Sequence, residues 1–175
     1  WEAELTPETI ARLGSLGLTA HFTFDEKDGN ATVNAVDPNS SGLIHGPVSR
    51  EEGRAGKALE FEGSTWVDAG QVGVFNSDDQ FSIAAQFRPT AHTGGAVLSK
   101  MDDGNAFRGY DLNYVNGKIE CHMINHWPDK AFKVVTKQSV SLDEWHHVVL
   151  CYDGSRQASG LQLFVDGRLQ ELDVT

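Results

Sequence analysis

Long hydrophobic runs, clustered basic residues and sustained helical periodicity are all missing from this chain of 175 residues. No apolar run approaches the roughly 20 residues that a membrane helix requires, so we expect no membrane insertion. Only 14 Lys and Arg residues oppose 25 Asp and Glu residues, which gives a net charge of -11. This balance disfavours nucleic acid as a partner, because nucleic acid rewards clustered basic side chains. It favours cation binding or a solvated acidic surface.

Cysteine is scarce as well. Cys121 and Cys151 are the two cysteines, and no C-x-x-C pair occurs. The sequence therefore supports no redox motif, no zinc knuckle and no c-type haem in this chain. Both residues lie in apolar, strand-like runs, which favours buried free thiols. A disulfide is the alternative, and it would require adjacent strands with Cα atoms about 5.5 Å apart.

One short helix is expected near the start of the chain. Thr6 suits the N-cap, Pro7 the first helical position and Glu8 the first turn. We therefore expect a leader helix and linker over residues 1–17. A single β domain would then occupy residues 18–175.

From residue 18 onward, short apolar runs alternate with Gly, Asn and Asp, which is typical of an all-β domain. Asn116-Gly117 is a strong signal for a type I′ hairpin, because both residues tolerate positive φ. The runs predict a two-sheet antiparallel sandwich with one core. The expected strands are 19–24, 43–48, 57–62, 65–69, 81–88, 96–100, 109–115, 118–124, 131–136, 146–152 and 161–166.

Several segments follow one another in the order of a known family's motifs. They are 20–26, 56–63, 81–89, 98–100, 109–112, 145–155 and 163–167, the last two of which reach Asp-Gly turns. Together they resemble the laminin-G-like (concanavalin A-like) jelly-roll family of lectins and glucanases, over roughly residues 18 to 172. The resemblance implies an all-β, two-sheet antiparallel jelly-roll sandwich. It leaves function open, since the family includes sugar binders, adhesion modules, structural inserts and enzymes.

The end of the chain departs from the family pattern. Family members continue past the 163–167 motif with two further strands, and the last of them pairs beside the first strand. This chain ends at Thr175, so we expect the domain to lack those strands. The sequence also resembles laminin-G-like inserts of large cytochrome-c-type multidomain proteins of planctomycete bacteria. That resemblance implies a piece of a larger extracytoplasmic protein (periplasmic, cell-surface or secreted).

Motifs for catalysis are missing. Enzymatic relatives carry two catalytic carboxylates on one strand as E-x-D-x-x-E, and glycoside hydrolysis requires such a pair. The sequence contains no E-x-D-x-x-E, and Glu60 and Glu62 are expected to face solvent. We therefore expect no enzyme, and a glycoside hydrolase is a minority alternative. His122 and His126 would lie about 13 Å apart on a strand, too far to share a zinc ion.

Calcium is the metal that the sequence favours, as one structural ion. Asp25, Asp37 and Asp153 each stand at the end of an expected strand or the start of a turn, and relatives hold a structural calcium near the sheet rim. Calcium takes six to eight oxygens, often from Asp side chains and loop carbonyls. The alternative is that each Asp caps the backbone of its own turn.

Carbohydrate binding requires aromatic platforms with polar partners nearby. Trp127 is the most suggestive, because it precedes Pro in a polar loop, where exposing a Trp is costly without a use. The alternative is that Trp127 folds back onto the sandwich. The candidate ligand-binding residues are Trp66, Tyr110, Asn113, Tyr114, Asn125, His126 and Trp127.

Taken together, these features predict a non-catalytic binding module for a polysaccharide or glycoprotein, within a larger protein. A structural or protein-interaction insert that contacts neighbouring domains is the alternative. Trp145 is expected in the core, as in the family strand. The other expected core residues are Phe22, Phe24, Leu59, Phe61, Ile83, Phe87, Leu112, Val148, Leu150, Tyr152, Leu163 and Val165.

Overall fold

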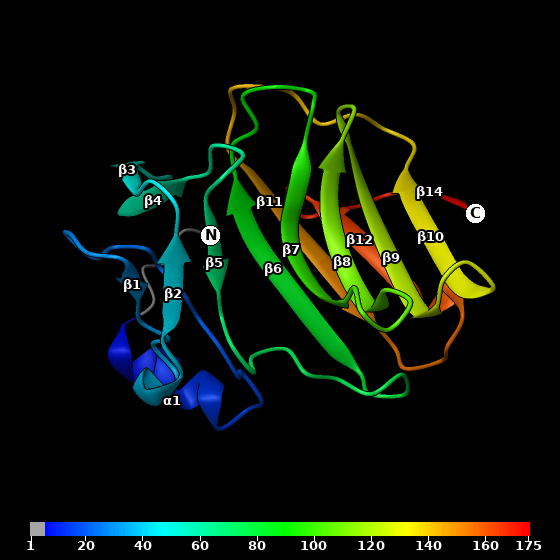
Figure 1. The fold of residues 1–175 in the computed structure, drawn as a ribbon, viewed down its shortest axis with the longest axis horizontal. Helices are drawn as coiled ribbons and strands as arrows, with labels where there is room; N and C mark the ends of the chain where they lie inside the picture. The colour runs from blue at the N-terminus through cyan, green and yellow to red at the C-terminus, as the bar shows by residue number, and fades with distance from the viewer. Residues whose placement is uncertain (1–5) are drawn as a thin grey trace. The chain divides into compact units, whose positions relative to one another are not determined.

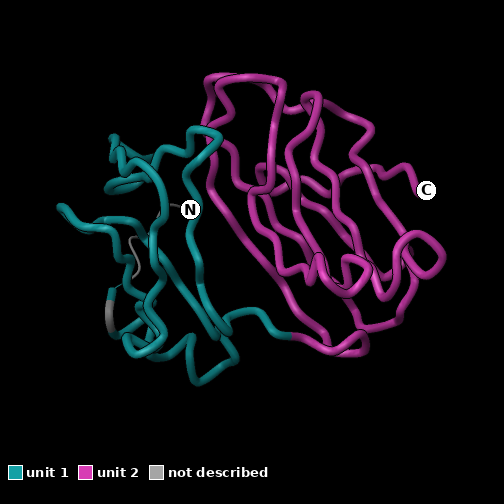
Figure 2. The backbone as a smooth tube through the Cα atoms, in the orientation of Figure 1, with its two compact units in different colours: residues 1–74 teal, residues 75–175 magenta. Residues whose placement is uncertain are grey.

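The computed structural model describes residues 6–175 and shows a chain built almost entirely from antiparallel strands (Figure 1). The fold is the expected jelly-roll sandwich with one short N-terminal helix. The chain divides into two compact units, residues 1–74 (unit 1) and residues 75–175 (unit 2), which Figure 2 colours separately. Among the described residues, no helix is long and apolar enough to cross a membrane.

Unit 2 is a sandwich of two antiparallel sheets that pack face to face. The five-stranded sheet has the order β14-β10-β9-β8-β7, and the four-stranded sheet has the order β13-β12-β11-β6. The strands of the first sheet are β7 (Gly95–Asp102), β8 (Arg108–Val115), β9 (Lys118–His126), β10 (Lys130–Thr136) and β14 (Leu172–Val174). Those of the second are β6 (Phe81–Phe87), β11 (His146–Tyr152), β12 (Leu161–Val165) and β13 (Arg168–Leu169). A 3-10 turn, η2 (Ala158–Gly160), precedes β12.

The core of unit 2 fills the space between its two sheets. Side chains alternate between the faces of a strand, so every second residue of β8, β9, β11 and β12 points inward. Leu112 and Leu150 are fully buried in this way. The buried members of the core are Phe81, Tyr110, Leu112, Tyr114, Ile119, Cys121, Val134, Val140, Val148, Leu150, Tyr152, Leu161 and Leu163.

The β8–β9 hairpin confirms the turn expected from the sequence. Asn116 and Gly117 have φ of 51° and 81°, and Val115 pairs with Lys118 across the turn. Positive φ at both central positions defines a type I′ turn, whose twist matches that of the flanking strands. Asp166 and Gly167 repeat the arrangement between β12 and β13, with φ of 49° and 75°.

Unit 1 contains the helix and the smaller sheets. Helix α1 (Pro7–Gly14) begins as predicted, because Thr6 Oγ1 accepts a hydrogen bond from the Thr9 N–H at 3.2 Å. The strands are β1 (Ala31–Thr32), β2 (Gly42–His45) and β5 (Trp66–Asp68), in the order β1-β2-β5, and the hairpin of β3 (Ser49–Glu52) with β4 (Lys57–Glu60). The 3-10 turn η1 (Pro38–Ser40) precedes β2. The boundary expected at residue 18 falls inside this unit.

Several expected strands and core positions are wrong in detail. The first predicted strand, 19–24, contributes one isolated bridge between Phe22 and Asn34 instead of a described strand. The pattern also missed the short strands β1, β3, β13 and β14, and β14 pairs with β10 at a sheet edge. Each of these four strands has only two to four residues, which gives a weak alternation signal, and none lies in a segment that resembles a family motif.

The expected core holds for six residues that are buried: Leu59, Leu112, Val148, Leu150, Tyr152 and Leu163. Phe61 is a clear error, because it is 54% exposed and contacts Phe24 edge-on. Trp145 precedes β11, is half-buried, and lies under the Arg88 guanidinium at 5.6 Å from the ring centroid. The remaining expected core residues, Phe22, Phe24, Ile83, Phe87 and Val165, are partly buried.

Both cysteines are free thiols. Cys121 points into the core from β9, and Cys151 alternates with the inward-facing Leu150 and Tyr152 and so points away from it. Burial, together with the negative charge of Asp111, raises the pKa of Cys121. Cys121 is therefore an inert packing residue rather than a reactive thiol.

Burial in the core makes Tyr110 a sensor of alkaline unfolding. Its pKa rises to about 12, first because burial penalises the phenolate and then because Cys121 adds like charge. A raised folded-state pKa means that the stabilisation is complete below the unfolded value near 10 and is lost as pH rises toward 12. We expect the free energy of unfolding, from urea titrations, to fall over this range. The fall should be shallower in Tyr110→Phe, and equal slopes would contradict the assignment. Tyr114, whose pKa burial also raises, should keep a residual slope in that variant.

Candidate functional site

The outward face of the five-stranded sheet carries a row of polar side chains. Leu112 pairs with Cys121, and both side chains point inward. The adjacent pair, Asp111 and His122, therefore points outward. Lys133 of β10 pairs with His122 on its other side, so Asp111, His122 and Lys133 lie in register across three strands. Two pairs from Asp111 and His122, and therefore on the same face, Asn113 faces Glu120. We call Asp111, Glu120, His122, Lys133 and the neighbouring Trp127 the β8–β10 site.

Asp111 and His122 form the most constrained contact of this site. The His122 Nδ1 atom lies 2.9 Å from Oδ1 and 3.2 Å from Oδ2 of Asp111. Oδ1 also accepts the backbone N–H of His122 at 2.8 Å. Both side chains are largely buried, at 11% and 18% exposure. A carboxylate held by several hydrogen bonds in a dry environment is fixed in position, and so is the imidazole bonded to it.

Glu120 and Lys133 form a second pair beside the first. The Lys133 Nζ atom lies 2.7 Å from Glu120 Oε2, and Glu120 is 14% exposed. Glu120 is two residues from His122 on β9 and therefore shares its face of the sheet. A half-buried ion pair of this kind positions both charged groups more than it stabilises the fold.

Trp127 supplies an aromatic surface at the edge of the site. It follows β9, its peptide bond to Pro128 is cis, and its backbone N–H donates to the carbonyl of Ala106 at 2.9 Å. Its ring meets His122 edge-on, with centroids 6.3 Å apart, and the side chain remains 46% exposed. Trp127 thus contacts the sheet face and still exposes much of its ring to solvent. This position is intermediate between the two alternatives expected from the sequence, an exposed binding residue and a residue folded back onto the sandwich.

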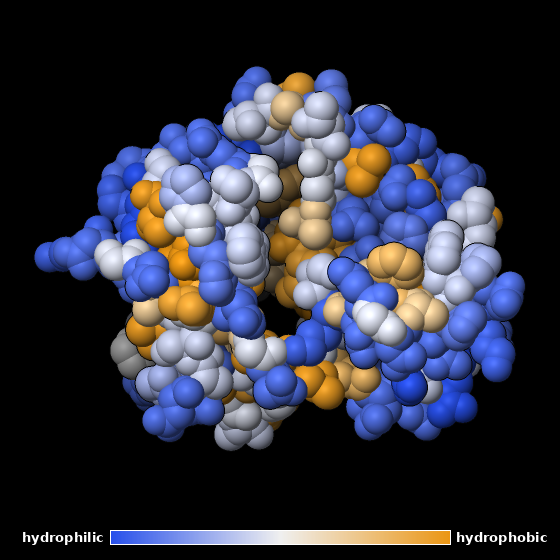
Figure 3. Space-filling model, viewed as in Figure 1, coloured by the Kyte–Doolittle hydropathy of each residue, from blue (hydrophilic) through white to orange (hydrophobic). Residues whose placement is uncertain are grey.

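Most of the surface over this sheet is hydrophilic, although Ile124 and Val135 share the outward register. Figure 3 shows it as mostly blue, with a small apolar patch over the β7–β8 turn. Phe107 of that turn is 47% exposed. An open, polar face with isolated aromatic groups is suited to a hydroxylated ligand more than to an apolar one.

The seven residues that we expected to bind a ligand differ in exposure and do not all lie together. Tyr110 and Tyr114 are wrong, because they are 5% and 4% exposed and pack in the core. Strand alternation explains the error, since Tyr110, Leu112 and Tyr114 share the inward face and Asn113 the outward one. Asn113 is brought to the same face as the β8–β10 site.

Asn125 and His126 end β9 and are both exposed, directly before Trp127. Trp66 lies in unit 1, on β5, and is 56% exposed. It stacks on His45 of β2, with ring centroids 4.5 Å apart and planes 6° from parallel. Trp66 is therefore a second exposed aromatic surface, and its use in binding stays a prediction.

The three carboxylates expected to hold calcium each bond to backbone N–H groups. Asp25 accepts from Lys57 at 2.7 Å and Asp37 from Asn39 at 3.1 Å. Asp153 accepts from the Ser155 N–H at 2.9 Å, and hydrogen bonds with the side chain and then the backbone of Ser155 lower the pKa of Asp153. Across residues 6–175, no three His, Cys, Asp or Glu side chains gather as a metal ion would require. The donor set does not fit a preformed calcium site, and calcium binding stays a prediction.

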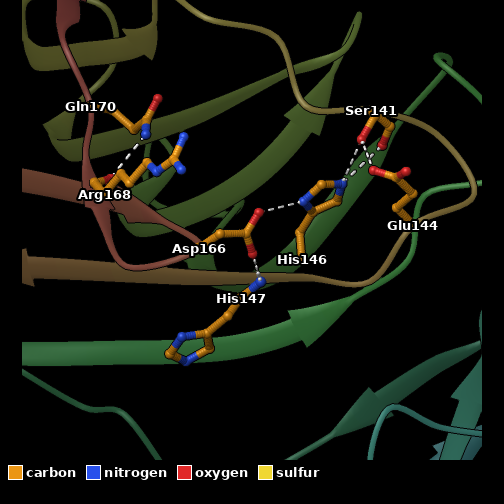
Figure 4. Close-up of polar contacts among 7 residues, drawn as sticks. All are labelled: Ser141, Glu144, His146, His147, Asp166, Arg168 and Gln170. Atoms are coloured by element: carbon orange, nitrogen blue, oxygen red, sulfur yellow. Dashed lines mark hydrogen bonds and ion pairs between the residues drawn. The ribbon is translucent and has the colours of Figure 1, made fainter. Parts of the chain in front are cut away.

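A second polar network lies in unit 2, at the start of β11 (Figure 4). His146 is 7% exposed, and its Nδ1 atom lies 2.8 Å from Asp166 Oδ2. Its Nε2 atom lies 3.1 Å from Ser141 Oγ and 3.2 Å from the Ser141 carbonyl oxygen. Ser141 Oγ donates to Glu144 at 2.7 Å, and Asp166 Oδ1 accepts the His147 N–H at 2.9 Å.

The role of this network is structural. Ser141, His146 and Asp166 contact one another in the same sequence as the Ser-His-Asp triad of a hydrolase. Ser141, however, donates its single hydroxyl proton to Glu144 and not to the imidazole. The contacts instead join the loop before β11 to the β12–β13 turn. Both ends of this connection lie in segments that resemble family motifs: His146 in 145–155 and the Asp166-Gly167 turn in 163–167.

Sequence reasoning missed Asp111, Glu120 and Lys133 as members of the site, and considered His122 only as a zinc ligand. A signal for two of these pairings was available. In a two-residue hairpin, residues equally distant from the turn face each other. Counting outward from Asn116-Gly117 therefore places Glu120 opposite Asn113 and His122 opposite Asp111. Lys133 lies on β10, and the turn between β9 and β10 has no comparable sequence signature, so its position could not be counted in this way.

Comparisons with known proteins agree on the fold. The family model described as the concanavalin A-like lectin/glucanases superfamily matches residues 61–173. A crystal structure of residues 221–444 of an S-layer domain-containing protein from Clostridium thermocellum is similar, with a TM-score of 0.57 and 18% identity. The match covers 88% of this chain and 71% of that one, and at this identity it shows the fold alone. No curated protein matches the chain.

The His146 network generates a prediction about stability. Asp166→Asn keeps a residue that tolerates the positive φ of the turn, but it removes the carboxylate that satisfies a buried imidazole. We expect a loss of about 1–3 kcal/mol in the free energy of unfolding, measured by urea titration. Asp173→Asn, on the exposed strand β14, is the matched control and should change it by less than about 0.5 kcal/mol. Equal stability of the two variants would rule out the assigned role.

Proposed function

Because the chain belongs to the concanavalin A-like lectin/glucanases superfamily, we propose that it is a non-catalytic binding module with a carbohydrate ligand. The ligand lies on the β8–β10 site. The observation that carries this proposal is Trp127, which is 46% exposed at the edge of a polar sheet face. An exposed indole ring beside fixed polar groups is what a sugar requires, since one face of the sugar is apolar and its rim carries hydroxyls.

The fixed polar groups support a binding role. Asp111 and Glu120 are each tied into an acid–base pair, with His122 and Lys133 respectively. Groups held by their neighbours lose little entropy when a ligand arrives. A glycosidase would instead require one carboxyl group kept protonated as the acid and a second as base or nucleophile. Asp111 is committed as the hydrogen-bond acceptor of His122, and Glu120 as the ion-pair partner of Lys133.

A second candidate function is an interaction domain within a larger protein. The observation in its favour is the outward face of the four-stranded sheet, where none of the outward positions of the described strands is Asp, Glu, Lys or Arg. These positions are Ser82, Ala84, Gln86, His147, Val149, Cys151, Gln162, Phe164 and Leu169. In a chain with 39 charged residues, from 14 basic and 25 acidic, such a face is suited to contact with a neighbouring domain.

The sequence of the parent gene separates the two candidates. A C-x-x-C-H haem motif elsewhere in the parent chain would favour the interaction insert of a cytochrome-c-type protein. Either role is compatible with an extracytoplasmic location, which we propose on the strength of the lectin-like family and of the structural neighbour described as S-layer domain-containing.

The proposed function predicts a loss of binding in Trp127→Ala. We expect native gels cast with β-glucan, xylan or galactomannan to retard the wild-type chain. The variant should raise the dissociation constant about tenfold or more, as expected for an aromatic group central to an interface. Trp66→Ala removes the other exposed tryptophan among residues 6–175 and should retain binding. Loss of binding in Trp66→Ala alone would place the ligand in unit 1 and contradict the proposed site.

A further inference from the structure

We infer that the β8–β10 site selects uncharged sugars over acidic sugars, because Asp111 fixes His122 as a hydrogen-bond acceptor. The inference rests on the proposed function and names the class of carbohydrate that the site takes. It makes Asp111 a positioning residue, which acts on the ligand through His122.

The Asp111 carboxylate determines which nitrogen of the His122 imidazole carries the proton. An ionised carboxylate has only acceptor atoms, so the ring nitrogen that faces Asp111 must carry a proton. That nitrogen is Nδ1, at 2.9 Å and 3.2 Å from the two carboxylate oxygens. In the neutral imidazole the second nitrogen, Nε2, is then an acceptor. Within the described residues, Nε2 makes no hydrogen bond of its own.

The charges around His122 act in the same direction. Asp111 lies directly across from it on β8, and Glu120 lies two residues away on the same face. Lys133 lies across from it on β10, but its ammonium group is 2.7 Å from Glu120 and is neutralised there. The whole chain carries a net charge of -11, which adds a repulsive background for any anion.

These two properties separate the ligand classes. A sugar hydroxyl can donate its proton to Nε2, so an uncharged sugar satisfies the acceptor. A uronic acid carboxylate has only lone pairs to offer Nε2, and it is repelled by Asp111 and Glu120. Discrimination by an unsatisfied polar contact exceeds what an apolar pocket achieves, because the group left unpaired is costly.

The test compares two polysaccharides and two variants. Galactomannan is the uncharged probe and polygalacturonate is the acidic probe, each cast in native gels at equal concentrations. Asp111→Asn removes one negative charge, and its amide can donate to Nδ1, which moves the imidazole proton to Nε2. Asp173→Asn is the matched control, because it removes the same charge from the same face, opposite Val135, without contact with His122.

We expect the wild-type chain to be retarded by galactomannan and not by polygalacturonate. Asp111→Asn should shift the ratio of the two dissociation constants toward polygalacturonate by about tenfold or more. Asp173→Asn should leave the ratio close to that of the wild type. An equal shift in Asp173→Asn would reduce the effect to charge alone and overturn the role of Asp111.

Two further outcomes separate this inference from the function on which it rests. Retardation of the wild-type chain by polygalacturonate, at equal or lower concentration, would overturn the selectivity and leave carbohydrate binding in place. Retardation by neither these probes nor the other uncharged polysaccharides would overturn the proposed function, and the inference with it.

A spectroscopic readout keeps the inference testable if Asp111→Asn does not fold. Nitrogen-15 NMR of the wild-type chain at mildly alkaline pH distinguishes the two imidazole tautomers by the chemical shifts of the ring nitrogens. We expect the His122 signals, identified by their loss in His122→Gln, to show a protonated Nδ1 and a bare Nε2. The opposite tautomer would contradict the inference directly.

Discussion

The pairing register of β8 and β9 is the constraint on which the rest of unit 2 depends. Leu112 and Cys121 pair with their side chains inward, so Asp111 and His122 must point outward. A slip of one residue would place a carboxylate in the core and expose Tyr110, Leu112 and Tyr114 to water. The positive φ angles of Asn116 and Gly117 close a two-residue turn that fixes this register. Core and candidate site are therefore two consequences of one pairing.

The same register holds the polar groups of the site in place. Asp111, His122 and Lys133 come from three neighbouring strands, and Glu120 and Lys133 neutralise each other beside them. Each group is positioned by a strand that the core already holds in place, so the site requires no loop to order upon binding. Trp127 is the exception, and its hydrogen bond to Ala106 and its contact with His122 attach its turn to the same sheet.

Much of the fold could be predicted from the sequence, because long strands and Asp-Gly or Asn-Gly turns carry local signals. The short strands β1, β3, β13 and β14 could not, since each has only two to four residues and none lies in a segment that resembles a family motif. Aromatic type alone misassigned Tyr110 and Tyr114, whose inward direction follows from Leu112 between them. Trp145 was misplaced because its neighbour Arg88 covers the ring from another strand end, a tertiary contact with no local signature. Asp111 and His122 were within reach, since their pairing follows from the turn.

The outward face of the β8–β10 strands, as fixed by this register, is the binding surface that we propose. The most direct measurement is amide chemical-shift mapping by NMR, with oligosaccharides prepared from a polysaccharide that retards the chain. We expect perturbations at residues 109–113, 120–124 and around Trp127. Perturbations confined to the strands around Trp66, or to the opposite sheet of unit 2, would contradict it.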